Sequence, residues 1–334
     1  MTASASAPHS ALAELDLPIV RLRVTLRLLD DGPLPAYKGA MLRGGLGYAF
    51  QRTCCAQPCW GNSASCVVSP PCAYRWIFET PHPPEVAQLH DLRDVPRPFV
   101  IVPPNDPRTA YLAGECLEFG MHFMGRGATH LLAFMLAFEE LGRMGLGRTH
   151  VRARLERAEI LAPWQLVGHV IYQDGRAHCD DVSLPQIDGA MIAARAATLP
   201  PDLRLTMRTP LSLKVRGAVL RRFDLGALVR AICWRLNALA LFHGGGRWSV
   251  DHQRLIEQAS AVRVEQVHTE WATYRRTSTR SSEPETMPMD GILGSVVLRA
   301  LAPELRAVLL AGSLTHVGKG CVFGYGHYTL TPAS

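Results

Sequence analysis

Alternating apolar and polar residues predict the strands in the first half of the chain. Residues 18–29 alternate apolar and basic positions, as a strand with one buried face does. The predicted strands of this half are 18–29, 96–104, 115–125 and 149–161, and the predicted helices, with apolar residues at helical spacing, are 38–53 and 129–147. This order of elements is the ferredoxin-like βαββαβ arrangement, an antiparallel sheet with two helices on one face.

The second half repeats the order in a looser form. Its predicted strands are 203–214, 261–278, 291–300 and 321–330, and its predicted helices are 225–244 and 303–312. The sequence therefore predicts an α+β fold of two tandem ferredoxin-like (RRM-like) domains, with antiparallel sheets and helices on one face. The expected parts are an N-terminal domain over 1–165 with a Cys-rich insertion without regular structure at 54–84, a connecting segment over 166–202 and a C-terminal domain over 203–334. The strand-like stretch 166–172 fits either domain.

Composition is that of a folded globular protein. Hydrophobic residues make up 48% of the chain and charged residues 19%. The longest apolar runs, 131–138 and 236–242, are shorter than the roughly 18–20 residues that span a bilayer. The first ten residues have neither the basic nor the apolar region of a secretory signal. We therefore expect a cytoplasmic protein without a membrane partner.

The basic residues are almost all arginine. Lysine occurs only at positions 38, 214 and 319, so 32 of the 35 basic residues are Arg, and the net charge is +6. A GC-rich genome produces such a bias without any functional demand. The other interpretation is that guanidinium groups suit phosphates and stack on bases. The charge alone is weak support for a nucleic-acid partner.

Five of the nine cysteines lie within residues 54–72. In a cytosolic chain such a cluster indicates a metal site or reduced thiols rather than disulfides. One interpretation is a structural zinc site, although the tight C-x2-C pairs of zinc ribbons are missing. Its expected ligands are Cys55, Cys59, Cys66 and Cys72. The alternative is an irregular loop that carries free thiols.

The stretch THVGKGCVFGYGHY at 315–328 is the densest cluster of glycines. Glycine costs folding entropy, so a group of four needs a structural or functional reason. One interpretation is a hairpin that needs unusual backbone angles, and the other is a loop whose N–H groups contact phosphates. The stretch does not fit the P-loop pattern, and GGLGYAF at 44–50 lies within a predicted helix rather than after a strand, which argues against a dinucleotide site.

Several stretches, in their order along the chain, resemble one family. GKGCVFGYGHY resembles the glycine-rich loop of the RAMP superfamily of CRISPR systems, and YKGAMLRGGLGYAFQR at 37–52 resembles the first helix of the CRISPR repeat-RNA processing endoribonucleases. Further similar stretches are 59–81, 140–160, 209–217 and 271–280. The resemblance implies a metal-independent endoribonuclease that needs no cofactor for catalysis. It binds CRISPR repeat RNA and cleaves precursor CRISPR RNA when a ribose 2′-OH attacks the adjacent phosphate, leaving a 2′,3′-cyclic phosphate.

The resemblance also suggests catalytic residues on the first helix. Tyr48 matches an active-site tyrosine of some members, whereas other members carry a histidine there, and this chain has no histidine between His9 and His82. A tyrosine hydroxyl normally stays protonated at neutral pH, so we expect Tyr48 to orient the 2′-OH. The cations expected to stabilise the phosphorane are Lys38, Arg43 and Arg52. The alternative for these three is a solvated basic helix face.

RNA binding is expected from the glycine-rich loop and from the long strand 261–278. Cations there would follow a phosphate backbone, and a tyrosine would stack on a base. The expected RNA-binding residues are Tyr274, Arg275, Arg276, Arg280, His316, Gly318, Lys319, Gly320, Gly324 and Gly326, and Trp271 is expected in the core. A second hypothesis, favoured by the missing histidine, is a non-catalytic RNA-binding subunit of a CRISPR effector complex. Other effector subunits are accordingly expected partners.

Overall fold

The computed structural model describes residues 11–55, 66, 68, 72–80, 82, 89, 92, 95–178, 184–278 and 285–333, with the backbone alone at 11, 275–278 and 285–288. The chain forms two compact units. The amino-terminal unit comprises residues 19–186 and 320–325, and the carboxyl-terminal unit comprises 1–18, 187–319 and 326–334. The glycine-rich segment, residues 315–328, is therefore shared, because its middle belongs to the amino-terminal unit and its ends to the other.

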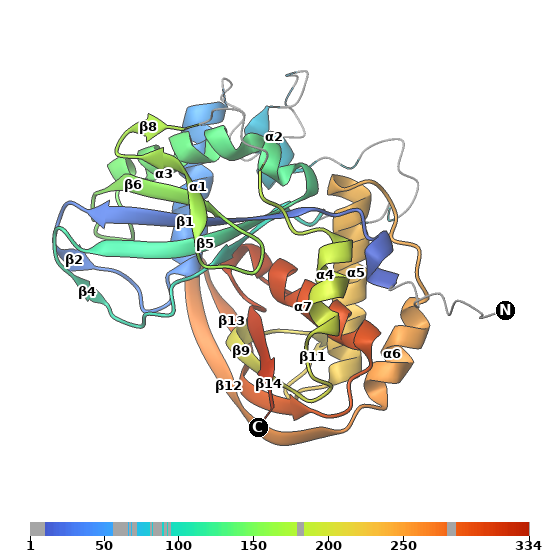
Figure 1. Cartoon of the computed structure of the whole chain (residues 1–334). Helices are drawn as coiled ribbons and strands as arrows, with labels where there is room; N and C mark the ends of the chain where they lie inside the picture. Colours follow the sequence, from blue (N-terminus) through green and yellow to red (C-terminus); the bar gives the residue numbers. More distant parts are fainter. Residues whose placement is uncertain are drawn as a thin grey trace. The chain divides into compact units, whose positions relative to one another are not determined.

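The amino-terminal unit has one main antiparallel sheet. Its principal elements are β1 (Ile19–Leu28), α1 (Gly39–Cys54), β3 (Phe99–Val102), β5 (Cys116–Met124), α3 (Leu131–Met144), β6 (Ala153–Leu161), β7 (Gly168–Gln173) and β8 (Arg176–Ala177). The strand order is β3-β5-β1-β6-β7-β8. Helices α1 and α3 pack side by side on one face of this sheet (Figure 1). Smaller elements are β2 (Gly32–Pro33), α2 (Ala73–Phe78), β4 (Ala110–Tyr111) and a 3₁₀ turn at Gly125–His130.

Aromatic side chains form much of the core between these helices and the sheet. Phe134 of α3 packs edge-on against Phe50 of α1, with ring centroids 4.9 Å apart, and against Phe123 of β5 at 4.7 Å. All three rings are fully buried. Edge-to-face pairs of this kind contribute about 0.5–1.5 kcal/mol beyond the area they bury. They fix α1, which carries the predicted catalytic residues, against the sheet.

The carboxyl-terminal unit repeats the same topology. Its principal elements are β9 (Leu203–Leu211), α5 (Leu225–His243), β12 (Val264–Ser278), β13 (Glu285–Leu298), α7 (Pro303–Thr315) and β14 (Tyr328–Pro332). The strand order is β12-β13-β9-β14. In both units the second, third, first and fourth strands lie side by side in that order, and the helices lie on one face (Figure 1). The predicted tandem ferredoxin-like fold is confirmed.

Further elements decorate this unit. They are η1 (Ala11–Glu14), α4 (Gly189–Ala197), the hairpin of β10 (Lys214–Val215) and β11 (Ala218–Val219), and α6 (His252–Ser260). The short turn η4 (Cys321–Phe323) belongs to the amino-terminal unit. Asp188, Asp224 and Asp251 cap α4, α5 and α6, each accepting a hydrogen bond from a backbone N–H of the first turn.

Three local predictions differ from the structure. The expected connecting segment 166–202 is divided between the units, because β7 pairs with β6 while α4 packs on α7. The expected strand at 321–330 begins only at Tyr328, since Gly320 and Gly324 have left-handed backbone angles that interrupt an extended chain. The insertion at 54–84 contains α2, whose amino end is capped by the Cys72 sulfur, which accepts from the N–H of Arg75.

Helix α5 is long and apolar enough to cross a membrane by length and composition. However, 72% of its most apolar window is buried inside the protein. It packs against α6 and α7. Its hydrophobicity is therefore that of a core helix.

Candidate nucleic-acid interface

Backbone geometry explains the glycine-rich segment. Gly318, Gly320, Gly324 and Gly326 have φ angles of 90°, 76°, 88° and 71°, a region in which side chains are strained. Space is also short, because a Cβ on Gly326 would lie 1.8 Å from the carbonyl oxygen of Val317 and one on Gly318 would lie 2.4 Å from that of Ser212. The glycines are therefore required by the fold of the segment itself.

The middle of the glycine-rich segment is held by the start of α1. The hydroxyl of Tyr37 donates a hydrogen bond of 2.6 Å to the carbonyl oxygen of Phe323. The Tyr37 ring also meets the Tyr325 ring edge-on, with centroids 5.0 Å apart. The Arg43 guanidinium lies over the rings of Phe78 at 4.5 Å and Phe323 at 5.8 Å. These contacts dock residues 320–325 within the amino-terminal unit.

The ends of the segment are held by the last residues of β9 and by Ser212, which follows it. The N–H of Lys319 donates to the carbonyl oxygen of Ser212 at 2.9 Å, and the N–H of Gly326 donates to that of Pro210 at 3.0 Å. Lys319 is exposed, as the RNA-binding prediction requires. His316 is wholly buried and stacks on His327, with ring centroids 4.9 Å apart. Its side chain therefore does not lie at the surface.

A basic hairpin stands beside Lys319. We use this name for residues 214–222, which carry four exposed cations and no acidic residue: Lys214, Arg216, Arg221 and Arg222. Arg216 and Gly217 form the turn, with φ angles of 49° and 84°. The Arg221 guanidinium lies 4.8 Å from the centre of the Trp271 ring on β12, a cation–π contact that holds one flank of the hairpin.

The sequence prediction missed this hairpin as a binding element, although the signal was available in KVRGAVLRR. Of the cations that were predicted on the long strand, Arg275 and Arg276 lie on β12, and Arg280 lies outside the described residues. Tyr274 is half-buried on β12 opposite Met289 of β13. Trp271, expected in the core, is only partly buried.

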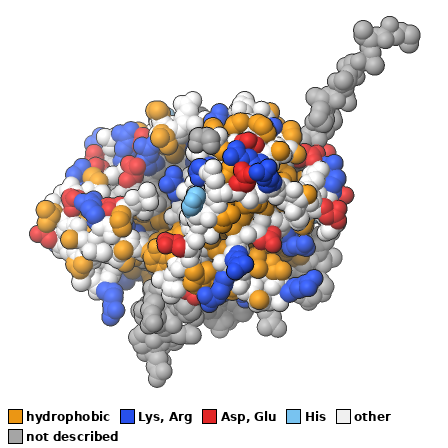
Figure 2. All heavy atoms as spheres, turned by 90° about the horizontal axis from the view of Figure 1, so that it is seen from below, with side chains coloured by type: hydrophobic (Ala, Val, Ile, Leu, Met, Phe, Trp, Pro, Cys, Tyr) orange, Lys and Arg blue, Asp and Glu red, His pale blue; other side chains and the backbone are white. Residues whose placement is uncertain are grey.

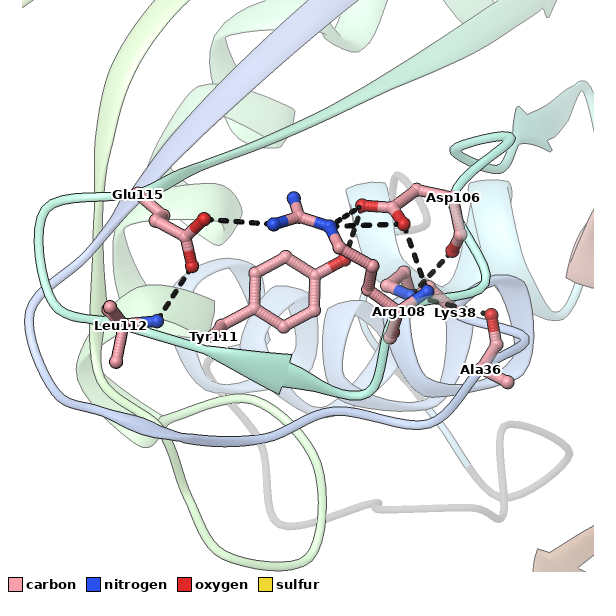
Figure 3. Close-up of polar contacts among 7 residues, drawn as sticks. All are labelled: Ala36, Lys38, Asp106, Arg108, Tyr111, Leu112 and Glu115. Carbon is pink, nitrogen blue, oxygen red and sulfur yellow. Dashed lines mark hydrogen bonds and ion pairs between the residues drawn. The ribbon is translucent and has the colours of Figure 1, made fainter.

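Lys38 occupies an enclosed position at the amino end of α1. It is 1% exposed, and its ammonium group donates to the carbonyl oxygens of Asp106 and Arg108, both at 2.7 Å (Figure 3). Burial lowers the pKa of Lys38. The neighbouring loop is fastened by Tyr111, whose hydroxyl donates to the Asp106 carboxylate at 2.8 Å, and by Arg108, which pairs with Glu115. Lys38 therefore anchors this loop.

The predicted catalytic residues do not all gather on one side of α1. Tyr48 is 37% exposed. Arg52, one turn further on, pairs with Glu140 of α3 at 2.8 Å. Arg43 lies about 140° around the helix from Tyr48, and Lys38 lies about 15 Å along the axis from it, by ideal helix geometry. The structure thus leaves Tyr48 and Arg52 on a common surface and does not bring Lys38 and Arg43 to it.

The cysteine cluster is only partly described. Cys54, Cys55 and Cys72 pack against the core of the amino-terminal unit, and burial raises the pKa of Cys54. Cys59 lies outside the described residues. Within the described part of the chain, no group of three His, Cys, Asp or Glu side chains is arranged to hold a metal. The zinc site remains a prediction.

Surface charge does not form one continuous basic field on the face shown in Figure 2. Lys and Arg side chains there make several separate groups, some next to acidic side chains. Net charge alone therefore does not locate an RNA path. The basic hairpin carries four exposed cations within nine residues and has the exposed Lys319 beside its base.

Comparison with protein families agrees with this geometry. The AF_1859_N model, described as an N-terminal domain, matches residues 17–186, half of the chain. A model of the CRISPR-associated endoribonuclease Cas6 matches residues 205–328. No curated protein matches the chain.

Solved structures share the fold at low identity. A partial Cas6-RT-Cas1–Cas2 complex is 15% identical with a TM-score of 0.61, and the match covers 96% of this chain and 47% of that one, so this chain spans about half its length. A Cas6 (TTHB231) product complex is 14% identical with a TM-score of 0.54, over 95% of this chain and 100% of that one. Thermus thermophilus Cas6 (TTHB231) is 13% identical with a TM-score of 0.51, and the match covers 94% of this chain and 99% of that one.

The tandem ferredoxin-like fold is therefore shared with solved Cas6 structures. The chain belongs to the family of the AF_1859_N model, which matches half of it. The predicted resemblance to the CRISPR repeat-processing endoribonucleases is confirmed over residues 205–328, where the Cas6 model matches.

Proposed function

We propose that this protein binds CRISPR repeat RNA and cleaves precursor CRISPR RNA without a metal ion, leaving a 2′,3′-cyclic phosphate and a 5′-OH. The observation that carries the proposal is the exposed Lys319 held against the base of the basic hairpin, both within residues 205–328, which match the Cas6 model. Five cations gather there: Lys214, Arg216, Arg221, Arg222 and Lys319. Such a group neutralises phosphates and releases their counterions.

The proposed reaction needs no group from outside the RNA and the protein. A base removes the 2′-OH proton, the 2′-oxygen attacks the adjacent phosphorus, the bond from phosphorus to the 5′-oxygen breaks, and the leaving oxygen takes up a proton. Tyr48 is our candidate to orient the 2′-OH, because its side chain is exposed on α1. Arg52 lies one turn away and is our candidate to stabilise the negative charge of the phosphorane. Its ion pair with Glu140 offsets part of the positive charge of Arg52.

Lys38 and Arg43 take other roles in this proposal. The Lys38 ammonium is committed to two carbonyl oxygens, and the Arg43 guanidinium lies among aromatic rings beside the glycine-rich segment. Each therefore supports the structure around α1, and neither is positioned at the same surface as Tyr48.

A second candidate function is non-catalytic binding of RNA within a CRISPR effector complex. The dispersal of the four predicted catalytic residues over α1, together with the lack of a histidine on that helix, favours it. Two of the similar structures are titled Cas6-RT-Cas1–Cas2 complexes. We propose other CRISPR proteins as partners, with the cytoplasm as the compartment.

Incubation with labelled repeat RNA in the presence of EDTA tests the proposal. We expect one site-specific cut in the repeat, retained in EDTA and lost or slowed in a Tyr48→Phe variant that still binds RNA. Tight binding without any cut would favour the non-catalytic function. A cut that EDTA abolishes would overturn metal independence while leaving the nuclease function in place.

A further inference from the structure

The sheet of the carboxyl-terminal unit has a polar face away from its helices. Along β9, buried Leu203, Leu205 and Met207 alternate with Arg204, Thr206 and Arg208. The strand register sets Thr329 of β14 and Ser295 of β13 on either side of Thr206. We call this surface the β9 face, comprising Arg204, Thr206, Arg208, Ser295, Thr329 and Thr331.

The two arginines of the β9 face donate to neutral oxygens. A terminal nitrogen of Arg204 donates to Gln266 Oε1 at 2.8 Å, and Nε of Arg208 donates to Thr329 Oγ1 at 3.2 Å. Arg208 is exposed and Arg204 is half-buried. The acidic residue nearest in register, Glu265, is held by Arg299 at 2.9 Å. The positive charge of the face is therefore available to a ligand.

The equivalent face of the amino-terminal sheet is built differently. There two of the three arginines of the first strand, β1, meet carboxylates: Arg27 pairs with Glu156, and Arg23 lies 3.9 Å from both Glu118 and Glu159. The third, Arg21, donates to the carbonyl oxygens of Ala162 and Gln165. On β6, Arg157 pairs with Glu159 at 2.7 Å. Ion pairing offsets the charge of this face. Both first-strand arginines of the carboxyl-terminal sheet donate to neutral oxygens, whereas in the amino-terminal sheet two of the three lie against carboxylates.

We infer that the β9 face binds the sugar–phosphate backbone of a single-stranded stretch of the RNA. This inference rests on the proposed function, because β9 runs through Ser212 directly into the basic hairpin. Guanidinium and hydroxyl groups match phosphate oxygens and 2′-hydroxyls. Arg204 and Arg208 are about 13 Å apart along the strand by ideal strand geometry. A flexible single strand can bend to contact both arginines. A rigid duplex is curved across its surface, so it contacts a sheet over a shorter length.

The test compares two RNAs and three variants. The RNAs are the repeat stem-loop alone and the same stem-loop with a single-stranded extension of about ten nucleotides, a length within single-strand site sizes. The variants are Arg204→Ala/Arg208→Ala, the charge-keeping Arg204→Lys/Arg208→Lys, and a control, Arg152→Ala/Arg254→Ala. The control removes two exposed arginines that pair with Asp30 and Glu304 and lie off the β9 face. Fluorescence anisotropy gives the dissociation constants between about 50 and about 200 mM salt.

We expect the wild-type protein to bind the extended RNA more tightly than the stem-loop. The alanine double variant should lose this difference, and its slope of log affinity against log salt should fall by about 1.4 on the extended RNA alone, at about 0.7 per single-strand phosphate. The lysine double variant should restore most of the slope, and the control should match the wild type.

Two results separate this inference from the proposed function. If the wild type binds and cuts the stem-loop but gains nothing from the extension, or if the alanine double variant keeps the gain, the β9 face does not bind RNA and the proposed function stands. If the wild type binds neither RNA, the proposed function itself is overturned.

Discussion

The backbone N–H of Lys319 donates a hydrogen bond of 2.9 Å to the carbonyl oxygen of Ser212. This bond joins the glycine-rich segment to the end of β9, two residues before the basic hairpin begins. It leaves the Lys319 side chain exposed while its backbone is fixed. A flexible lysine on a fixed backbone is well suited to contact a phosphate as a point charge.

Replacing Lys319 by alanine should weaken RNA binding without unfolding the protein. The side chain is exposed, so the substitution removes one phosphate contact and little packing. The slope of log affinity against log salt should fall by about 0.7–0.9, measured by anisotropy. Arg254→Ala is the matched control, because Arg254 is also exposed and is paired with Glu304. Equal slopes for the wild type and Lys319→Ala would remove Lys319 from the interface.

Gly326→Ala should destabilise the protein far more than Gly175→Ala. Both glycines have positive φ, 71° and 84°, which costs an alanine about 1–2 kcal/mol. Only at Gly326 does the new Cβ also collide with backbone, 1.8 Å from the Val317 carbonyl oxygen, whereas Gly175 faces open space. Chemical denaturation should show that Gly175→Ala lowers the free energy of unfolding by about 1 kcal/mol and that Gly326→Ala lowers it clearly more. Similar losses at both positions would show that the close approach is not required.

The partly buried His327 should make the protein less stable in mild acid. Burial, with a smaller contribution from Arg208, lowers the pKa of His327 from 6.5 to about 4. The unfolded chain therefore binds this proton more tightly than the folded protein. Stability present above pH 6.5 is lost as the pH falls towards 4, by about 3 kcal/mol in all.

Denaturation at several pH values checks this, with His327→Gln as the comparison. His130 and His252 also have pKa values lowered by burial. The free energy of unfolding of the wild type therefore falls in acid by more than the contribution of His327 alone. The difference between the two proteins isolates His327 and should change mainly between pH 6.5 and 4. A difference that stays constant over this range would contradict the assignment.

Tyr48→Phe should slow cleavage by about a hundredfold, the cost of a misplaced reacting group, because its hydroxyl no longer orients the 2′-OH, and RNA affinity should stay unchanged. Its side chain is exposed on α1, so loss of the hydroxyl should not affect folding. Tyr111→Phe is the matched control. It removes a hydrogen bond to Asp106 and should cost about 1 kcal/mol of stability without slowing the cut. Unchanged single-turnover rates in Tyr48→Phe would exclude its hydroxyl from the reaction.

The predicted zinc site is tested by metal content. If Cys55, Cys59, Cys66 and Cys72 hold zinc, the purified protein should contain about one equivalent, as four thiolates hold one ion in a structural site. A Cys59→Ser/Cys66→Ser variant should lose the metal and melt at a lower temperature. Cys233→Ser is the control, since Cys233 is buried in α5. A wild-type protein purified without zinc, and no less stable after the double substitution, would contradict the site.

The fold was predictable because its main strands alternate and its helices have regular apolar spacing. For β1, the predicted 18–29 compares with Ile19–Leu28 in the structure. The alternation of apolar and polar residues does not predict the structure where backbone angles determine it. At Gly320 and Gly324, left-handed conformations replace the expected strand with a turn. The sequence pattern also misses α2, because a cysteine cap is not a sequence signal for a helix start.

The candidate site was less predictable than the fold. A lysine beside a predicted catalytic helix suggests an exposed cation, and only the three-dimensional structure shows that carbonyl oxygens from 106 and 108 surround Lys38. His316 likewise stands next to a predicted RNA loop, yet it is buried on His327. Contacts made only in the folded chain determine both outcomes, and the local sequence pattern does not show them.

Product analysis after single-turnover cleavage of labelled repeat RNA in EDTA tests the central claim most directly. The proposed function predicts a single cut whose upstream product carries a 2′,3′-cyclic phosphate and whose downstream product carries a 5′-OH. Tight binding with no cut, or products with a 5′-phosphate, would contradict it.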